Sequence, residues 1–115
     1  MIIEINQMSF EQATLDAAMS HADVFRTDLV DWLAVPVNFI VWSSFVYQAN
    51  SAWNKGFRHY SARTIGEYLR HHTAMSDAGH DFKLNDWIWP DLARLYMHVY
   101  PDRAGFFETR GRRAA

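Results

Sequence analysis

Apolar residues recur at helical spacing along the longest uncharged stretch of the chain, Trp32 to Asn54. On one side of this stretch they return every three or four residues, the period of an α-helix: Val37, Ile40, Val41, Phe45, Ala49, Ala52 and Trp53. The other faces also carry apolar residues, namely Trp42, Val46 and Tyr47. The pattern therefore predicts a central helix that other elements cover on several sides.

Residues suited to the two ends of a helix flank this stretch. Pro36 fits a first helical position, where a backbone N–H would lack a partner anyway. Lys55 favours the negative end of the helix dipole, and Gly56 readily takes the left-handed conformation that ends a helix. We therefore expect the central helix to run from about Pro36 to Lys55.

Two shorter helices are expected before the central one. Ser9 and Gln12 form a capping-box pattern, which predicts a helix from Ser9 to about His21. The preceding Met1–Ile5 suits a short strand or a docked arm. A second helix would begin at residue 22 or 23, with Val24, Phe25, Leu29, Val30 and Leu33 as its buried residues.

Two more helices are expected after the central one. The first runs from Ala62 to about Met75, and its inward residues are Ile65, Tyr68, Leu69 and His72. The second begins near Pro90 and Asp91, which suit a first helical turn, and it ends at Pro101. Its inward residues are Leu92, Leu95, Tyr96 and Val99.

A small β element is expected late in the chain. Phe82–Asn85 alternates apolar and polar residues, as a half-buried strand does, and Phe106–Arg110 is its expected antiparallel partner. Such a pair is marginal alone, so it would lean on the helices. The expected fold is mainly α, within the α+β class, as one compact domain over residues 1–115. Its architecture is loosely similar to a winged helix, by analogy only.

Composition indicates the number of domains and the compartment in which the protein would reside. The chain has 115 residues, the length of one domain, and it contains no cysteine, which excludes disulfides and fits a reducing compartment. The uncharged stretch is long enough to cross a bilayer, but its Ser, Asn and Gln residues would be costly in lipid. We therefore expect a soluble, cytoplasmic protein without a membrane span.

Charge is divided unevenly along the chain. Residues 1–50 contain six acids and one base, whereas residues 51–115 contain ten bases and seven acids, although the net charge is only −2. The domain would thus have an acidic helical half, 1–56, a basic half, 57–110, and a short basic tail, 111–115. Contact with an anionic partner and mutual attraction of the two halves explain this division about equally well.

Residues 56–110 contain a set of short motifs: Tyr60-Ser61-Ala62-Arg63-Thr64-Ile65, Arg70, Phe82-Lys83-Leu84-Asn85, Pro90, Ala93-Arg94, Pro101 and Gly105-Phe106-Phe107-Glu108-Thr109-Arg110. This set resembles a group of small phage and prophage proteins of unassigned function. The chain departs from the group's pattern at Asp86, where a second asparagine is expected. The resemblance implies a mobile-element setting and nothing about catalysis.

Basic and aromatic residues of the second half are the candidates for contact with nucleic acid. Arginine forks fit phosphate oxygens, and aromatic rings stack on unpaired bases. The expected interface consists of Arg58, His59, Arg63, Arg70, Lys83, Trp87, Trp89 and Arg110. Arg94 is instead expected to pair with Asp91 or Glu108 inside the fold, and the two tryptophans would also suit the core. The isoelectric point of about 6.3 is low for a committed DNA-binding domain.

Candidate ligands and acid–base groups form no recognisable catalytic pattern. His71 and His72 are adjacent, so they point in different directions from a helix and do not suit one zinc ion. His80-Asp81 follows Gly79 in an expected turn, and the sequence lacks the usual phosphate-loop and nucleophile motifs. We therefore expect no enzyme activity, metal or cofactor, and a small metal-dependent enzyme is only the third reading.

Protein binding is the alternative to nucleic-acid binding. Tyr, Trp and Arg anchor many interfaces, and all three are plentiful in this chain. The acids of the first half would face a basic channel of a target or form an ordinary solvated face: Glu11, Asp16, Asp23, Asp28 and Asp31. The sequence thus favours nucleic-acid binding first. An inhibitor of a host protein complex, of the anti-CRISPR or another anti-defence type, comes second, and a homodimer stays open.

Overall fold

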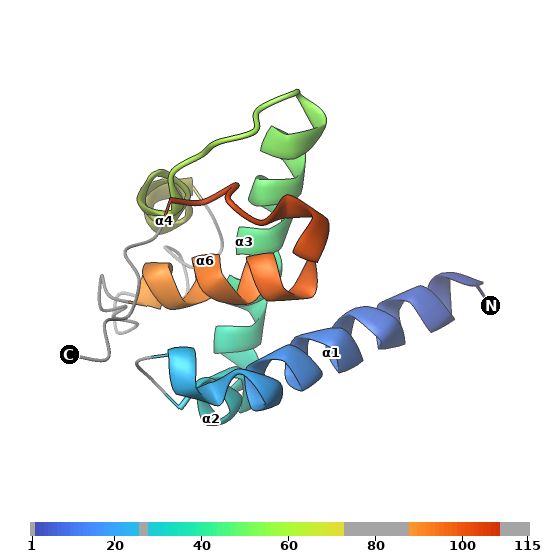
Figure 1. The fold of residues 1–115 in the computed structure, drawn as a ribbon. Helices are drawn as coiled ribbons and strands as arrows, with labels where there is room; N and C mark the ends of the chain where they lie inside the picture. The colour runs from blue at the N-terminus through green and yellow to red at the C-terminus, as the bar shows by residue number, and fades with distance from the viewer. Residues whose placement is uncertain (1, 26–27, 73–87, 109–115) are drawn as a thin grey trace.

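Helices make up most of the described chain (Figure 1). The computed structural model describes residues 2–25, 28–72 and 88–108, with side chains for 10–25, 28–71 and 88–108. The elements are α1 (Ile2–Ser20), the 3-10 turn η1 (Ala22–Val24), α2 (Leu29–Ala34), α3 (Pro36–Asn54), α4 (Ala62–His72), α6 (Ile88–Val99) and the 3-10 turn η2 (Pro101–Arg103). The mainly α fold expected from the sequence is confirmed.

α3 is the central helix that the sequence predicts. It begins at Pro36 and ends at Asn54, with Lys55 as its C-cap. Gly56 follows, and its φ of 103° lies in the left-handed region. Its buried side consists of Val41, Trp42, Phe45, Val46, Ala49 and Ala52. However, Ile40 and Tyr47 are 59% and 70% exposed, so one face of α3 stays open. Within the described ranges, no helix is both long and apolar enough to cross a membrane.

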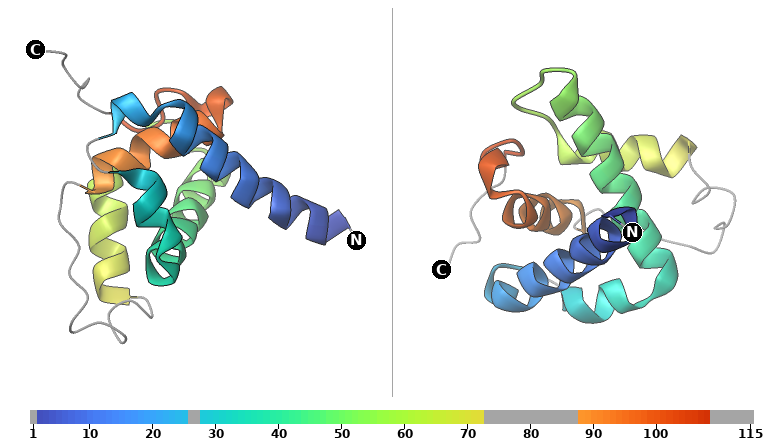
Figure 2. Two further views of the ribbon diagram at one scale, coloured as in Figure 1. Left: turned by 90° about the horizontal axis from the view of Figure 1, so that it is seen from below. Right: turned by 90° about the vertical axis from the view of Figure 1, so that its right-hand side faces the viewer.

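α1 is longer than the sequence indicates. The strand or arm expected at the start of the chain and the helix start at Ser9 are wrong, because α1 already begins at Ile2. A capping pattern only favours a start, whereas each residue added to an existing helix gains a backbone hydrogen bond. The expected end near His21 is confirmed. The N-terminal part of α1 extends away from the other helices (Figures 1 and 2).

The second expected helix is divided into η1 and α2. Asp28 is the N-cap of α2, and its side chain accepts a hydrogen bond of 3.3 Å from the backbone N–H of Asp31. Phe25, Leu29 and Leu33 are buried, as the apolar pattern predicts. These residues anchor the η1–α2 segment in the same core as α3.

α4 and α6 confirm the two helices expected late in the chain, although α6 begins at Ile88, before Pro90, and the expected end of the first near Met75 lies outside the described residues. α4 buries Ile65 and Leu69, whereas Tyr68 is 44% exposed. α6 buries Leu92 and Leu95 completely, and its Trp89 packs against Gly66 of α4. The absence of a side chain at Gly66 lets the two helices approach closely at this point.

Residues 106–108 do not form the expected strand. Tyr60 and Phe107 make one isolated parallel bridge, and the backbone N–H of Tyr60 donates a 2.9 Å hydrogen bond to the carbonyl oxygen of Phe106. Both Phe106 and Phe107 are buried. Neighbouring residues of a strand point to opposite faces, so a half-buried strand cannot bury both rings. The proposed partner strand at 82–85 lies outside the described residues, and residues 106–108 show no winged-helix wing.

Candidate functional site

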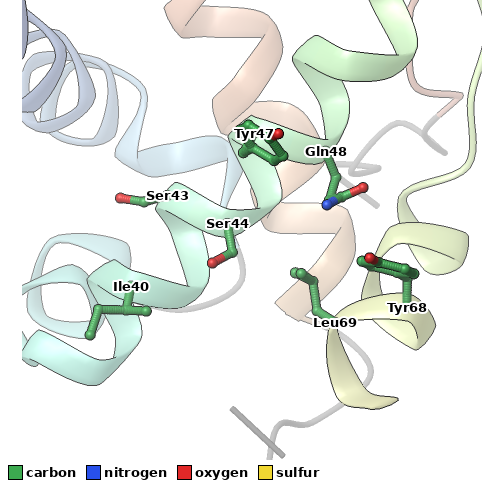
Figure 3. A pocket seen from close by; sticks show the side chains of 7 residues that line it. All are labelled: Ile40, Ser43, Ser44, Tyr47, Gln48, Tyr68 and Leu69. Carbon is green, nitrogen blue, oxygen red and sulfur yellow. The ribbon is translucent and has the colours of Figure 1, made fainter. Parts of the chain in front are cut away.

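A groove lies between the open face of α3 and the neighbouring face of α4. It is a hollow of about 400 Å³, lined by Ile40, Ser43, Ser44, Tyr47, Gln48, Tyr68 and Leu69. Figure 3 shows Ser44 and Gln48 of α3 facing Leu69 and Tyr68 of α4. We call this surface the α3–α4 groove.

The chemistry of the α3–α4 groove is apolar and neutral. None of the described residues that line it is charged. Ile40, Tyr47 and Tyr68 supply exposed apolar area, and half-buried Ser43 and Ser44 supply small hydroxyl groups between them. The groove therefore offers neither a cation for phosphate nor a carboxylate for acid–base chemistry. It suits the apolar face of a polypeptide segment.

The α3–α4 groove was missed by the sequence reasoning, which took Ile40 and Tyr47 for core residues. A signal was present in the sequence. Residues 40, 44, 47 and 48 share one face of a helix, and on that face the polar residues Ser44 and Gln48 alternate with the apolar residues Ile40 and Tyr47. Polar residues at such spacing indicate a face that borders solvent rather than the interior.

A second candidate surface, which we call the Trp53 surface, lies at the carboxyl end of α3. It consists of Trp53, the two arginines on its ring, Arg58 and Arg103, and the exposed residues Lys55 and His59 that follow α3. The guanidinium carbon of Arg58 is 4.0 Å from the centroid of the Trp53 ring, and that of Arg103 is 4.7 Å away. Arg58 also donates hydrogen bonds of 3.1 and 2.9 Å to the carbonyl oxygens of Trp53 and Phe57. Arg58 thus satisfies a carbonyl at the end of α3 in addition to its contact with the indole ring.

Arg103 takes part in a hydrogen-bonded network below this surface. It donates to the side-chain oxygen of Asn50 at 2.7 Å and to the hydroxyl of Tyr96 at 2.6 Å. Tyr96 in turn donates a 2.7 Å hydrogen bond to Asn50. Burial raises the pKa of Tyr96, and Arg103 opposes that rise. The network therefore holds the neutral phenol of Tyr96 against the guanidinium of Arg103. Through Asn50 it also links α3 to α6 and η2.

Of the eight residues expected to contact nucleic acid, two lie at the Trp53 surface. Arg58 and His59 are exposed there, and Nδ1 of His59 is 3.3 Å from the carbonyl oxygen of Gly105. Arg63 and Arg70 lie on α4, and both have interactions within the chain. Three of the eight lie outside the described residues, namely Lys83, Trp87 and Arg110.

Trp89 is a core residue, so its expected role as a stacking surface for bases is wrong. It is only 3% exposed. Its ring stacks on Phe45, with centroids 6.2 Å apart and an interplanar angle of 11°, and it also lies against Gly66. A ring enclosed by α3 and α4 cannot meet a base without unfolding of the core.

Arg94 confirms the internal pairing that was expected for it. Its Nη1 lies 3.6 Å from Oδ1 of Asp91, which is completely buried. A buried carboxylate requires such partners, because an uncompensated charge in the interior is strongly destabilising. Arg94 therefore compensates the buried carboxylate of Asp91 within α6 rather than binding an anion of another molecule.

Two histidines meet where the end of α1 packs against α6. The rings of His21 and His98 stack with centroids 3.9 Å apart and an interplanar angle of 11°. Burial lowers the pKa of His98, His21 lowers it further, and Asp23 opposes both effects. Within the described ranges, no group of three or more His, Asp or Glu side chains gathers as a metal site would require. His80-Asp81 lies outside those ranges.

The chain was compared with known proteins. No protein-family model, curated protein or solved structure gives a significant match.

Proposed function

We propose that this protein is a small binding module that associates with another polypeptide chain through the α3–α4 groove, without catalysing a reaction. The observation that carries the proposal is the uncharged open face of α3. Ile40 and Tyr47 are exposed there, on a helix whose opposite side is buried in the core. Exposed apolar groups that flank a hollow are typical of interaction surfaces.

The chemistry of the groove restricts what would bind in it. Tyr47 and Tyr68 provide rigid aromatic area of the kind that anchors interfaces. A charge buried against this neutral lining would lack a partner, so the occupant must present an uncharged, apolar face. A helix with an apolar stripe meets this requirement, because its own backbone hydrogen bonds are already made. In the phage setting that the resemblance implies, the helix would belong to a host protein.

A photo-reactive residue in place of Gln48 tests this proposal. Gln48 lines the groove, so irradiation in cells should cross-link one defined polypeptide at this site. The cross-link should disappear when Ile40→Asp or Tyr47→Asp is added. Met19 is 58% exposed on α1, outside the set of residues that line the groove. Met19→Asp is therefore the matched control and should leave the cross-link intact. A cross-link that survives both groove substitutions contradicts the proposal.

Nucleic-acid binding is the second candidate, and the Trp53 surface favours it. Lys55 and Arg58 are exposed at the carboxyl end of α3, and the Arg58 guanidinium lies over the half-buried indole ring of Trp53. Exposed cations beside an aromatic ring are typical of surfaces that bind single strands. Titration of single- and double-stranded DNA at two salt concentrations tests this candidate. Lys55→Gln should reduce the salt slope by about one if Lys55 contacts a phosphate. Absence of binding at low salt rejects it.

A further inference from the structure

We infer that, in the isolated protein, the α3–α4 groove is occupied by a second copy of the same chain. The two α3 helices would lie antiparallel about a two-fold axis that passes between Ser43 and Ser44. This inference rests on the proposed function, because it accepts the groove as an association surface and names its occupant. A partner helix would then have to displace the second copy.

The order of large and small residues along α3 matches such an axis. Ile40 lies three residues before Ser43, and Tyr47 lies three residues after Ser44. An antiparallel two-fold arrangement therefore places Ile40 beside Tyr47 of the second copy, and Tyr47 beside its Ile40. The small serines meet at the crossing point, where short side chains let two helix backbones approach closely. Both exposed apolar residues of α3 would be covered in one step.

The absence of charge on α3 removes the main obstacle to this arrangement. A two-fold axis brings each residue near its own counterpart, so a charged residue at the axis would face a like charge. The sequence has no charged residue between Asp31 and Lys55. Antiparallel packing also sets the positive end of one helix dipole beside the negative end of the other. Two copies of this face of α3 can therefore pack together without repulsion between like charges.

Sedimentation of the purified protein at increasing concentration gives the first test. The wild-type chain should shift from monomer to dimer. Ser44→Lys places like charges at the axis and should weaken the dimer by about a hundredfold. The double variant S43E/S44K should recover much of the loss, because each new acid would oppose the new base of the second copy. Circular dichroism verifies that each variant folds. A wild-type chain that stays monomeric at every concentration overturns the inference.

Single-cysteine variants give the second test, since the chain contains no cysteine of its own. Ser44→Cys lies beside the axis, so mild oxidation should link two copies rapidly. Ser51→Cys is the matched control on the same face of α3. In the antiparallel arrangement the two copies of residue 51 lie roughly 22 Å apart along the helix, too far for a disulfide. Equal cross-linking of both variants overturns the inference.

The photo-reactive residue at position 48 separates this inference from the proposed function. Capture of a second copy, lost in Ser44→Lys, supports both. Capture of a different protein by a monomeric chain overturns the second copy as occupant and leaves the groove as a binding surface. Capture of no polypeptide at all overturns both.

Discussion

The indole N–H of Trp42 donates a 3.0 Å hydrogen bond to the hydroxyl of Thr14, and both side chains are completely buried. The two residues are far apart in the chain, so this bond fixes α1 against α3. Trp42 also stacks on Phe10 of α1, with ring centroids 6.2 Å apart. The position of α1 thus depends on one buried polar contact together with apolar packing.

Thr14→Val removes the acceptor while it preserves the shape of the side chain. The indole N–H of Trp42 would stay buried without a partner, so the free energy of unfolding should fall by about 1–3 kcal/mol. Urea denaturation measures this loss as a lower midpoint with an unchanged slope. Thr14→Ser retains the hydroxyl and should lose less. Equal stability of Thr14→Val and wild type would contradict the buried hydrogen bond.

Gly66→Ala should destabilise the protein, although alanine normally favours a helix. A methyl group at this position would overlap the Trp89 indole, with Cδ2 only 2.7 Å away. Overpacking of this kind costs about 1–3 kcal/mol, which exceeds the gain in helix propensity of about 1 kcal/mol. Thermal unfolding measures the net loss. Glu67→Ala, on the exposed side of α4, should change stability by no more than about 0.5 kcal/mol. A stabilised Gly66→Ala would show that the ring does not lie there.

The stacked histidines predict a loss of stability in mild acid. Burial and His21 lower the pKa of His98 below its ordinary value of 6.5, so the unfolded chain binds a proton more readily than the folded one. The contribution of neutral His98 to the free energy of unfolding should therefore be fully present above pH 6.5. It should be lost as the pH drops through the lowered pKa of His98. Nearby Asp23 reduces the effect without removing it. Denaturation midpoints across this range provide the measurement.

His98→Phe separates titration of His98 from general acid effects. Phenylalanine keeps an aromatic ring against His21 but cannot bind a proton. The variant should show a weaker dependence of stability on pH than the wild type between pH 6.5 and mild acid. Identical profiles for the two proteins would assign the acid sensitivity to other groups.

Arg103→Met should raise the pKa of Tyr96 further. Burial already raises this pKa above 10.0, and Arg103 is the main factor that opposes the rise. Ultraviolet absorbance of the phenolate during an alkaline titration follows the change. Because the raised pKa favours the neutral phenol in the folded state, its contribution to stability should be lost as the pH rises above 10. An unchanged titration in Arg103→Met would contradict the contact between the guanidinium and the phenol.

Local signals in the sequence were sufficient to predict the two late helices, α4 and α6, and the positions at which α3 begins and ends. Pro36 fixes its own φ near the helical value, and Gly56 lacks the Cβ that would disfavour a positive φ, so the two ends of α3 follow from the covalent geometry of single residues. The pair formed by Arg94 and Asp91 is likewise local, because residues three apart meet on a helix. The start of α1 could not be predicted in this way, since a capping pattern at Ser9 does not exclude further helix before it.

The sequence by itself determined that the chain is mainly helical and that an uncharged central helix organises it, because helix period and helix ends are properties of neighbouring residues. Only the tertiary structure decided which apolar side chains are covered. The sequence pattern assigns Ile40 and Tyr47 to covered faces of a central helix and offers Trp89 as a surface for bases. Packing instead encloses Trp89 between α3 and α4 and leaves Ile40 and Tyr47 exposed at the groove. Burial depends on contacts between distant segments, and no local pattern specifies those contacts.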